Sequence, residues 1–184
     1  MNRTWCRSGP SCGISGPGTA PRPTWTPLDG GIRARLLLLL ETPGPQVFKT
    51  AFVSRDNPTG TASNLFRYLS EAGIPRRETL IWNAVPWVIQ VPGARNRSPR
   101  ASEARAAIRE LPPLLDPLPR LQGILLAGRV AGFAQDTIRT LRPEVAVIAI
   151  PHPSPANVCT SPLVAERIRD GLRRARGLLG LDPA

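Results

Sequence analysis

The chain has 184 residues and a formal net charge of +11, a size that allows one domain with a sizeable core. The charge favours an anionic partner, and nucleic acid is a stronger candidate than an acidic membrane surface. It does so only weakly, because every basic residue except Lys49 is arginine, a composition that a coding bias also produces. The apolar run 36–40 is too short to cross a membrane or to form a signal-peptide core. Three cysteines without a Cys-x-x-Cys pair exclude a fully paired disulfide framework, so we expect a reduced, cytoplasmic protein without metal or other cofactor.

Residues 1–31 are rich in Pro, Gly, Ser and Thr, and we expect a flexible tail there, followed by one domain over 32–184. From residue 33 onward, apolar runs alternate with helical stretches, which predicts an α/β fold built on a parallel sheet. The predicted strands are 35–40, 79–83, 122–127 and 145–150. The predicted helices are 61–72, 102–111, 131–141 and a last one from about 160 to 177, and Pro112 and Pro113 are expected to end the second.

Each predicted strand ends in residues that can carry chemistry. Glu41 follows the first strand, Asn83 ends the second, Gly128 and Arg129 follow the third, and the only histidine, His152, follows the fourth. Because the strands are expected to be parallel, these residues meet at one edge of the sheet. A carboxylate, an amide and an imidazole together can activate water, read the edge of a heteroaromatic ring and stabilise a departing anion.

Each of these residues also has an ordinary structural explanation. His152 suits a turn, Glu41 a solvent-facing strand end and Asn83 a turn, while Gly128 suits close helix packing. Their coincidence at four strand ends favours a shared site over four separate explanations. The arginines of the last helix are expected to form a solvated face.

At this point the sequence resembles the uracil-DNA glycosylase superfamily over residues from about 35 to the C-terminus. The resemblance rests first on three motifs, each of which follows a predicted strand: Leu40-Glu41-Thr42-Pro43-Gly44, Ile81-Trp82-Asn83-Ala84-Val85 and His152-Pro153-Ser154-Pro155. Two further segments, 57–65 and 125–131, are similar to the start of the family's first helix and to its third strand and turn. The resemblance implies a three-layer α/β/α sandwich over a short four-stranded parallel sheet, with DNA crossing the carboxyl edge of the strands.

The resemblance also implies roles for individual residues in the hydrolysis of the N-glycosidic bond of a flipped uracil, a step of base excision repair. Glu41 is expected to position water or to stabilise the cationic sugar, and His152 to stabilise the departing base. The base-binding residues are expected to be Pro43, Gly44, Asn83 and Phe52, with Asn83 rejecting cytosine because its donor and acceptor pattern is reversed. The DNA-binding residues are expected to include Ser154, Asn157 and Arg129.

The chain departs from the family pattern at four places. Leu40 stands where a glycine usually precedes the acidic residue, and Ala156 stands where the best-known members place a leucine wedge. The expected stacking aromatic aligns with Pro58, so Phe48 or Phe52 has to supply the stack. The four cysteines that hold an iron–sulfur cluster in one branch of the family are missing.

A basic segment follows the strand that ends at Asn83. Residues 94–100 hold three arginines and no acidic residue, and either phosphate contact or a solvated loop explains them equally well. The three are Arg95, Arg97 and Arg100.

The sequence leaves the substrate and even catalysis open. Our first hypothesis is a monomeric uracil-DNA glycosylase acting on single- or double-stranded DNA. A second is a glycosylase for hypoxanthine or another deaminated base, and a third is a non-catalytic protein that binds damaged DNA. Hydrolysis of a small nucleoside or nucleotide is a weaker fourth option.

Overall fold

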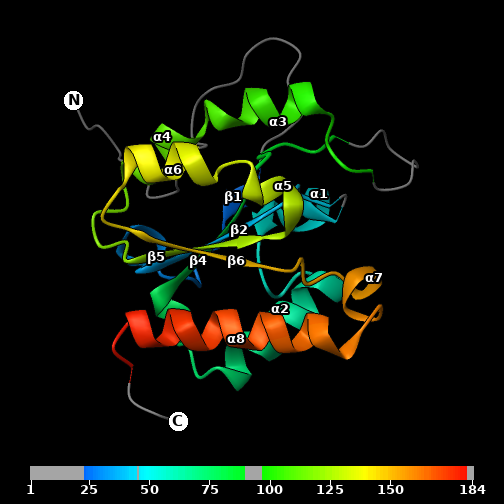
Figure 1. The fold of residues 1–184 in the computed structure, drawn as a ribbon. Coiled ribbons are helices and arrows are strands. Elements are labelled where there is room, and N and C mark those ends of the chain that lie inside the picture. Colours follow the sequence, from blue (N-terminus) through cyan, green and yellow to red (C-terminus); the bar gives the residue numbers. More distant parts are fainter. Residues whose placement is uncertain (1–22, 45, 90–96, 182–184) are drawn as a thin grey trace, which may run out of the picture.

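The computed structural model in Figure 1 describes residues 23–44, 46–89 and 97–181. Its centre is a sheet of four strands: β2 (Leu36–Leu40), β4 (Thr79–Asn83), β5 (Gly123–Ala127) and β6 (Ala146–Ile150). Their order across the sheet is β4-β2-β5-β6, and every neighbouring pair is parallel. Each strand starts and ends within one residue of its predicted range, so the four predicted strands are confirmed.

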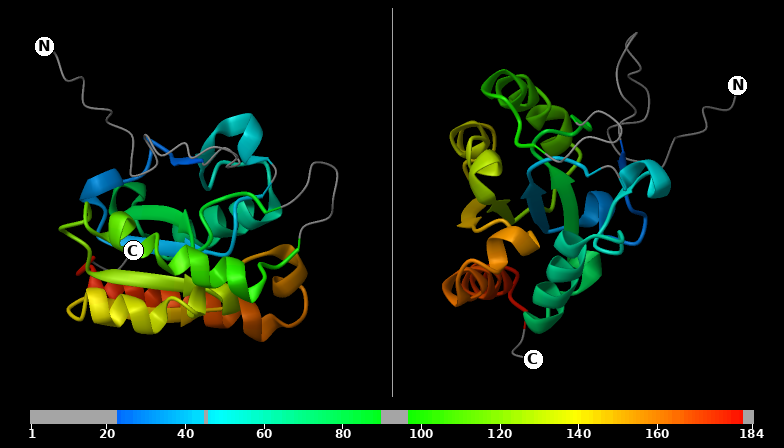
Figure 2. Two further views of the ribbon diagram at one scale, coloured as in Figure 1. Left: turned by 90° about the horizontal axis from the view of Figure 1, so that it is seen from above. Right: turned by 90° about the vertical axis from the view of Figure 1, so that its right-hand side faces the viewer.

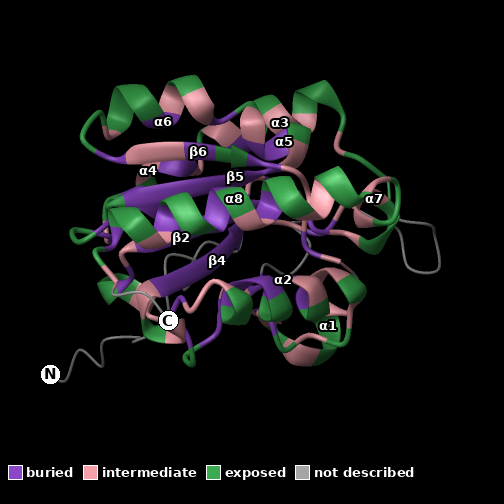
Figure 3. Cartoon of the chain, turned by 60° about the horizontal axis from the view of Figure 1, so that its bottom comes forward, coloured by how far each residue is buried: buried purple, intermediate pink, exposed green. Residues whose placement is uncertain are grey.

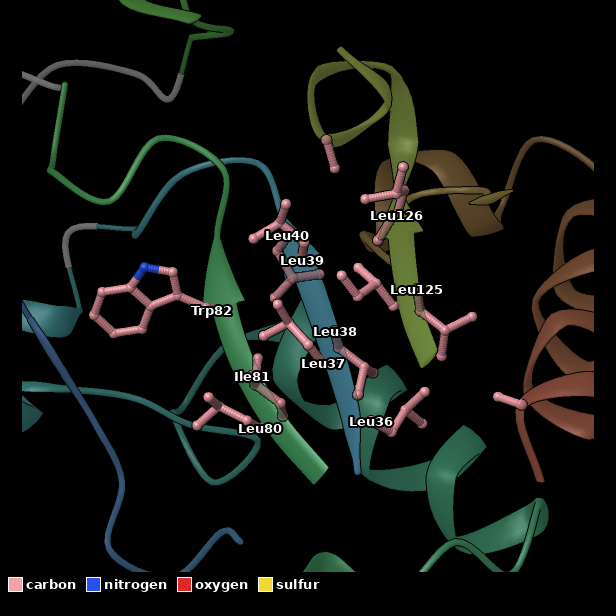
Figure 4. Close-up of a cluster of buried hydrophobic side chains, with 14 of the residues drawn as sticks. Leu36, Leu37, Leu38, Leu39, Leu40, Leu80, Ile81, Trp82, Leu125 and Leu126 are labelled. Carbon is pink, nitrogen blue, oxygen red and sulfur yellow. The ribbon is translucent and has the colours of Figure 1, made fainter. Parts of the chain in front are cut away.

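The strands form because their side chains are apolar on both faces and helices cover both faces. All five leucines of β2 are buried, and Figure 4 shows them between side chains of β4 and β5, among them Trp82 and Leu125. Full burial of a leucine stabilises the fold by roughly 1.5–3 kcal/mol. Strand β6 lies at the edge of the sheet, and its residue Ala149 is exposed. Figure 3 shows β6 as partly exposed beside the buried strand β5.

Helices lie on the two faces of the sheet, as Figures 1 and 2 show, which confirms the predicted α/β/α arrangement. One face is covered by α3 (Ala101–Ile108), α4 (Leu111–Leu115), α5 (Gly128–Gly132) and α6 (Gln135–Leu141), and the other by α2 (Gly60–Glu71) and α8 (Pro162–Leu178). No helix in the described ranges is both long and apolar enough to cross a membrane. Two shorter helices are α1 (Val47–Thr50) and α7 (Pro155–Val158), and 3-10 turns lie at η1 (Gly31–Arg33) and η2 (Arg76–Glu78).

The folded part begins before the predicted boundary at residue 31. Strand β1 (Thr24–Trp25) pairs in parallel with β3 (Phe52–Val53), and the buried Trp25 ring meets the Trp82 ring edge-on at 6.2 Å. Asp29 is buried as well, and its carboxylate accepts a hydrogen bond from Arg76 Nε at 2.9 Å. The β1–β3 pairing, the Trp25 ring and the Asp29 carboxylate all tie this stretch to the core, although its composition resembles a linker. The expected flexible tail otherwise falls on residues 1–22, outside the described residues.

The helices differ from the predicted ones at Pro112 and Pro113, and at the break that follows Gly132. Helix α3 ends at Ile108, and Pro112 and Pro113 stand in the first turn of the short helix α4, where a missing N–H costs nothing. The predicted helix 131–141 corresponds to α6, which begins only at Gln135, and a separate short helix, α5, runs from Gly128 to Gly132 before it. Helix α7, directly after the His152 turn, was not predicted because four residues are too few for a periodic pattern.

Candidate active site

A cavity of about 470 Å³ opens beside the carboxyl ends of β2 and β4. These ends lie on the right of Figure 1 and face the viewer in the right-hand view of Figure 2. Strand β2 is the first strand of this sheet along the chain; the second, β4, pairs on one side of it and the third, β5, on the other. Where the strand order reverses in this way, a crevice opens at the carboxyl edge of parallel α/β sheets. The predicted site residues that line the cavity are Glu41, Pro43, Gly44, Asn83, Arg97, His152 and Ser154.

Glu41 is held at the cavity by the sheet itself. The backbone N–H of Val85 donates to the Glu41 carbonyl at 3.0 Å, and that of Ala84 donates to Leu40 at 2.8 Å, so the β2–β4 pairing continues past the last strand residues. The Glu41 side chain is half-buried and makes no hydrogen bond or ion pair with the residues that the structure describes. Its carboxylate is therefore available to water or to a positive charge in the cavity.

Asn83 is the last residue of β4 and only 4% exposed. It lies opposite Leu40 in the register of β2 and β4, which places it beside the start of the Glu41 loop. Within the described part of the chain its side-chain amide has no hydrogen-bond partner, although the residue is buried. A buried amide facing a cavity offers one donor group and one acceptor to a ligand.

His152 is held in one tautomer by its own loop. The backbone N–H of Ser154 donates to Nδ1 of His152 at 3.2 Å, so Nδ1 carries a lone pair and the neutral ring has its proton on Nε2. Burial lowers the pKa of His152 below its ordinary value, because the charged form loses hydration. Near neutral pH the ring is an uncharged Nε2–H donor.

Gly128, at the end of β5, makes room for this histidine. Its φ is +87°, a conformation that favours glycine, and a Cβ added there would lie 2.8 Å from the His152 Cβ. The neighbouring Arg129 is exposed and is not among the lining residues. Close packing was the ordinary structural explanation for Gly128. The structure shows such packing, and the residue that packs against Gly128 is the site residue His152.

Other predicted residues lie away from the cavity. Successive side chains of a strand point to opposite sides, and Val53 of β3 lines the cavity whereas Phe52 does not. Phe48 is half exposed on α1 and also lies outside the lining, so no Phe, Tyr or Trp ring lines the cavity in the described part of the chain. Asn157 of α7 donates its side-chain N–H to the His152 carbonyl at 2.8 Å and so supports the loop.

Arg97 lines the cavity but is bound within the protein. Its two terminal nitrogens donate to the two carboxylate oxygens of Glu103 at 2.7 and 2.8 Å, and to the carbonyls of Ile89 and Ser98 at 3.2 Å. The hydrogen bonds from Arg97, together with the Arg100 backbone N–H, lower the pKa of Glu103 to about 2. Arg97 therefore joins the cavity rim to α3, an interaction missed because Glu103 lies beyond the basic segment. Arg100 is exposed, and Arg95 lies outside the described residues.

The stretch between β3 and α2 supplies lining residues that the sequence did not single out as a site. Asn57 donates its side-chain N–H to the Phe52 carbonyl at 2.9 Å, and the Thr59 hydroxyl accepts from the Ala62 N–H at 3.2 Å. Both residues line the cavity, together with Gln46 of the loop before α1. A Thr-Gly pair before an apolar helix is a capping pattern, which is the local signal for this wall. Across the described ranges, no three His, Cys, Asp or Glu side chains come together as metal ligands.

Comparison with known proteins identifies a family and a fold. A model of the uracil DNA glycosylase superfamily matches residues 28–172. SMUG2 of Pedobacter heparinus has a similar fold, with a TM-score of 0.55 at 12% identity over 80% of this chain and 76% of that one. A structure described as a candidate uracil DNA glycosylase of Methanosarcina acetivorans gives a TM-score of 0.48 at 15% identity over 78% of this chain and 93% of its own. No curated protein matches the sequence. Because the family match covers well over half of the chain, the protein belongs to the uracil DNA glycosylase superfamily.

Proposed function

We propose that the protein is a DNA glycosylase that hydrolyses the N-glycosidic bond of uracil flipped out of DNA. The observation that carries this proposal is the meeting of Glu41, Asn83 and His152 in one cavity at the carboxyl edge of the sheet. They come from three separate strand ends and supply a carboxylate and an amide that have no side-chain partner among the described residues, and a neutral imidazole. The superfamily match supports the same chemistry.

In the proposed reaction the bond between the sugar C1′ and the base nitrogen breaks, and its electron pair leaves with the base. Glu41 faces the positive charge that develops on the sugar and orients the water whose oxygen then bonds to C1′. Glu41 also accepts the proton that this water loses, and the base anion takes up a proton to leave as the neutral base. The Nε2–H of His152 donates a hydrogen bond to the base oxygen on which the negative charge gathers. The lowered pKa of His152 suits this role, because the neutral ring stabilises the base anion by donating a hydrogen bond and does not protonate the base before the bond breaks.

Asn83 is proposed to read the base. Its oxygen accepts the ring N–H of uracil, and its NH₂ group donates to the neighbouring carbonyl, whereas cytosine presents the opposite pattern at both positions. The cavity lining is mixed: it includes the aliphatic residues Val47, Val53 and Leu65, and also polar residues such as Gln46 and Asn57. We propose Ser154 at the cavity, with the exposed Arg129 and Arg100, as contacts to the DNA backbone.

One observation favours a second candidate substrate, a deaminated purine such as hypoxanthine. A cavity of about 470 Å³ without a Phe, Tyr or Trp in its described lining leaves room for a second ring. Hypoxanthine also presents a ring N–H beside a carbonyl, which is the pattern that Asn83 pairs with in uracil.

Release of free base from oligonucleotides that contain uracil, hypoxanthine or xanthine, in single and double strands, tests both candidates. We expect uracil to be released fastest, and we expect Glu41→Gln to lower its release at least about a hundredfold. The matched control is Glu166→Gln, which changes an exposed carboxylate on α8 and is expected to keep release unchanged. If no base is released at high enzyme excess and damaged DNA is still bound tightly, the protein is a non-catalytic damage binder. If a free nucleoside reacts and DNA does not compete, the substrate is a small molecule.

A further inference from the structure

Helix α2 holds the loop that carries His152. The side-chain NH₂ of Asn64 donates to the Pro153 carbonyl at 2.8 Å. One turn earlier on the same face, a Cβ added to Gly60 would lie 2.3 Å from Cγ of Pro155, so only a glycine lets the helix approach the loop this closely. Two residues four positions apart on α2 therefore contact residues 153 and 155.

The same helix forms part of the cavity wall. Thr61, Ala62 and Leu65 line the cavity, while Leu65, Tyr68 and Leu69 are buried in the core. The Thr59 hydroxyl caps the first turn by accepting from the Ala62 N–H. Because α2 is fixed at its start and along its buried face, the residues that it presents to the His152 loop are fixed as well.

Asn64 and His152 are connected through one peptide group. The carbonyl of Pro153 and the N–H of Ser154 belong to the same planar unit. Asn64 donates to the oxygen of that unit, and the N–H of that unit donates to Nδ1 of His152 at 3.2 Å. Fixing the carbonyl therefore fixes the direction of the N–H, and donation to the carbonyl strengthens the N–H as a donor.

We infer that Asn64 is a positioning residue that holds His152 in the Nε2–H tautomer through the Pro153–Ser154 peptide group. This inference rests on the proposed function for its catalytic meaning, because the Nε2–H group is the one offered to the departing base. Asn157 supports the loop from the other side of His152, by donating to the His152 carbonyl. Without Asn64 the peptide group is free to rotate, and Nδ1 loses its donor for part of the time.

The test uses the fact that the chain has one histidine, so imidazole nitrogen NMR signals belong to His152 without assignment. In the full-length wild type we expect an unprotonated Nδ1, a protonated Nε2 and a pKa below the ordinary histidine value. In Asn64→Leu, which keeps the size and removes the donor, we expect a mixture of tautomers. We also expect a raised His152 pKa, because the Ser154 N–H that donates to Nδ1 stabilises the unprotonated ring. The control is Ser63→Ala, an exposed neighbour on α2, which is expected to change neither.

Activity gives a second, separate readout. Asn64→Leu is expected to slow base release about tenfold, the scale of one lost hydrogen bond, and to cause no further loss when His152 is already alanine. If Asn64→Leu does not fold, Asn64→Ala is measured in the same way. An unchanged tautomer and pKa in a folded Asn64 variant, or an additive loss in the double variant, would overturn the inference. If Asn64→Leu changes the His152 NMR signals as expected but the wild type releases no base, the inference is supported and the proposed function is refuted.

Discussion

Replacing Gly128 by alanine is expected to destabilise the fold and to displace His152. Gly128 has a φ of +87°, where any residue with a Cβ is strained, and the new Cβ would lie 2.8 Å from the Cβ of His152. Two carbon atoms do not approach this closely without repulsion. Neither atom sits at the end of a flexible side chain, so relief requires the backbone at the end of β5 or in the His152 loop to move.

The magnitude follows from these two effects. The left-handed conformation costs about 1–2 kcal/mol for a residue with a Cβ, and the crowded contact adds about 1–3 kcal/mol, as overpacking does elsewhere. We therefore expect a loss of about 3 kcal/mol in the free energy of unfolding. Such a loss is a large part of the 5–15 kcal/mol that is typical of a folded domain.

Urea unfolding followed by tryptophan fluorescence measures this loss, and the matched control lies in the same helix. Gly132 ends α5 without a positive φ, and an added Cβ there meets nothing within 4 Å, so Gly132→Ala is expected to be neutral or slightly stabilising. Base release per folded molecule is expected to fall in Gly128→Ala and to persist in Gly132→Ala. If both variants unfold at the same urea concentration with the same activity, the contact between Gly128 and His152 does not constrain the site.

Four further predictions concern single side chains. Glu41→Gln is expected to lower base release at least about a hundredfold in single-turnover assays while DNA binding persists; unchanged turnover would remove Glu41 from the mechanism. His152→Ala is expected to cost on the order of 3 kcal/mol in the transition state; if the variant only loses thermal stability, His152 is a turn residue. In the wild type, activity is expected to persist below pH 6.5, because burial lowers the His152 pKa and keeps the ring neutral there. Glu103→Gln is expected to cost at most about 1 kcal/mol at pH 7, a difference seen in urea unfolding above pH 4.5 that disappears toward pH 2, because the pKa of Glu103 is lowered to about 2. Arg100→Ala is expected to flatten the slope of log affinity against log salt by about one unit and Arg97→Ala by less, because Arg97 is already bound to Glu103; equal slopes would assign the two arginines the same role.

The sequence alone predicts the sheet well because its signals are local. Five consecutive leucines after residue 35 have no polar face, which is typical of a strand covered on both sides, and the central residues of the other three runs are apolar as well. Parallel pairing then brings the four strand ends to one edge without further information. Glu41, Asn83 and His152 were predicted together for this reason, and the cavity brings all three together.

Only the tertiary structure decided which neighbours these residues meet. Trp25 belongs to the core through its contact with Trp82, although its segment has the composition of a linker. Phe52 and Val53 are adjacent in sequence, but the placement of β3 decides that Val53 lines the cavity. The hydrogen bond from Asn64 to Pro153 joins residues 89 positions apart, and nothing in the local pattern of α2 marks that asparagine. Apolar periodicity reports the burial of a chain segment, whereas such contacts depend on how segments distant in sequence pack against one another.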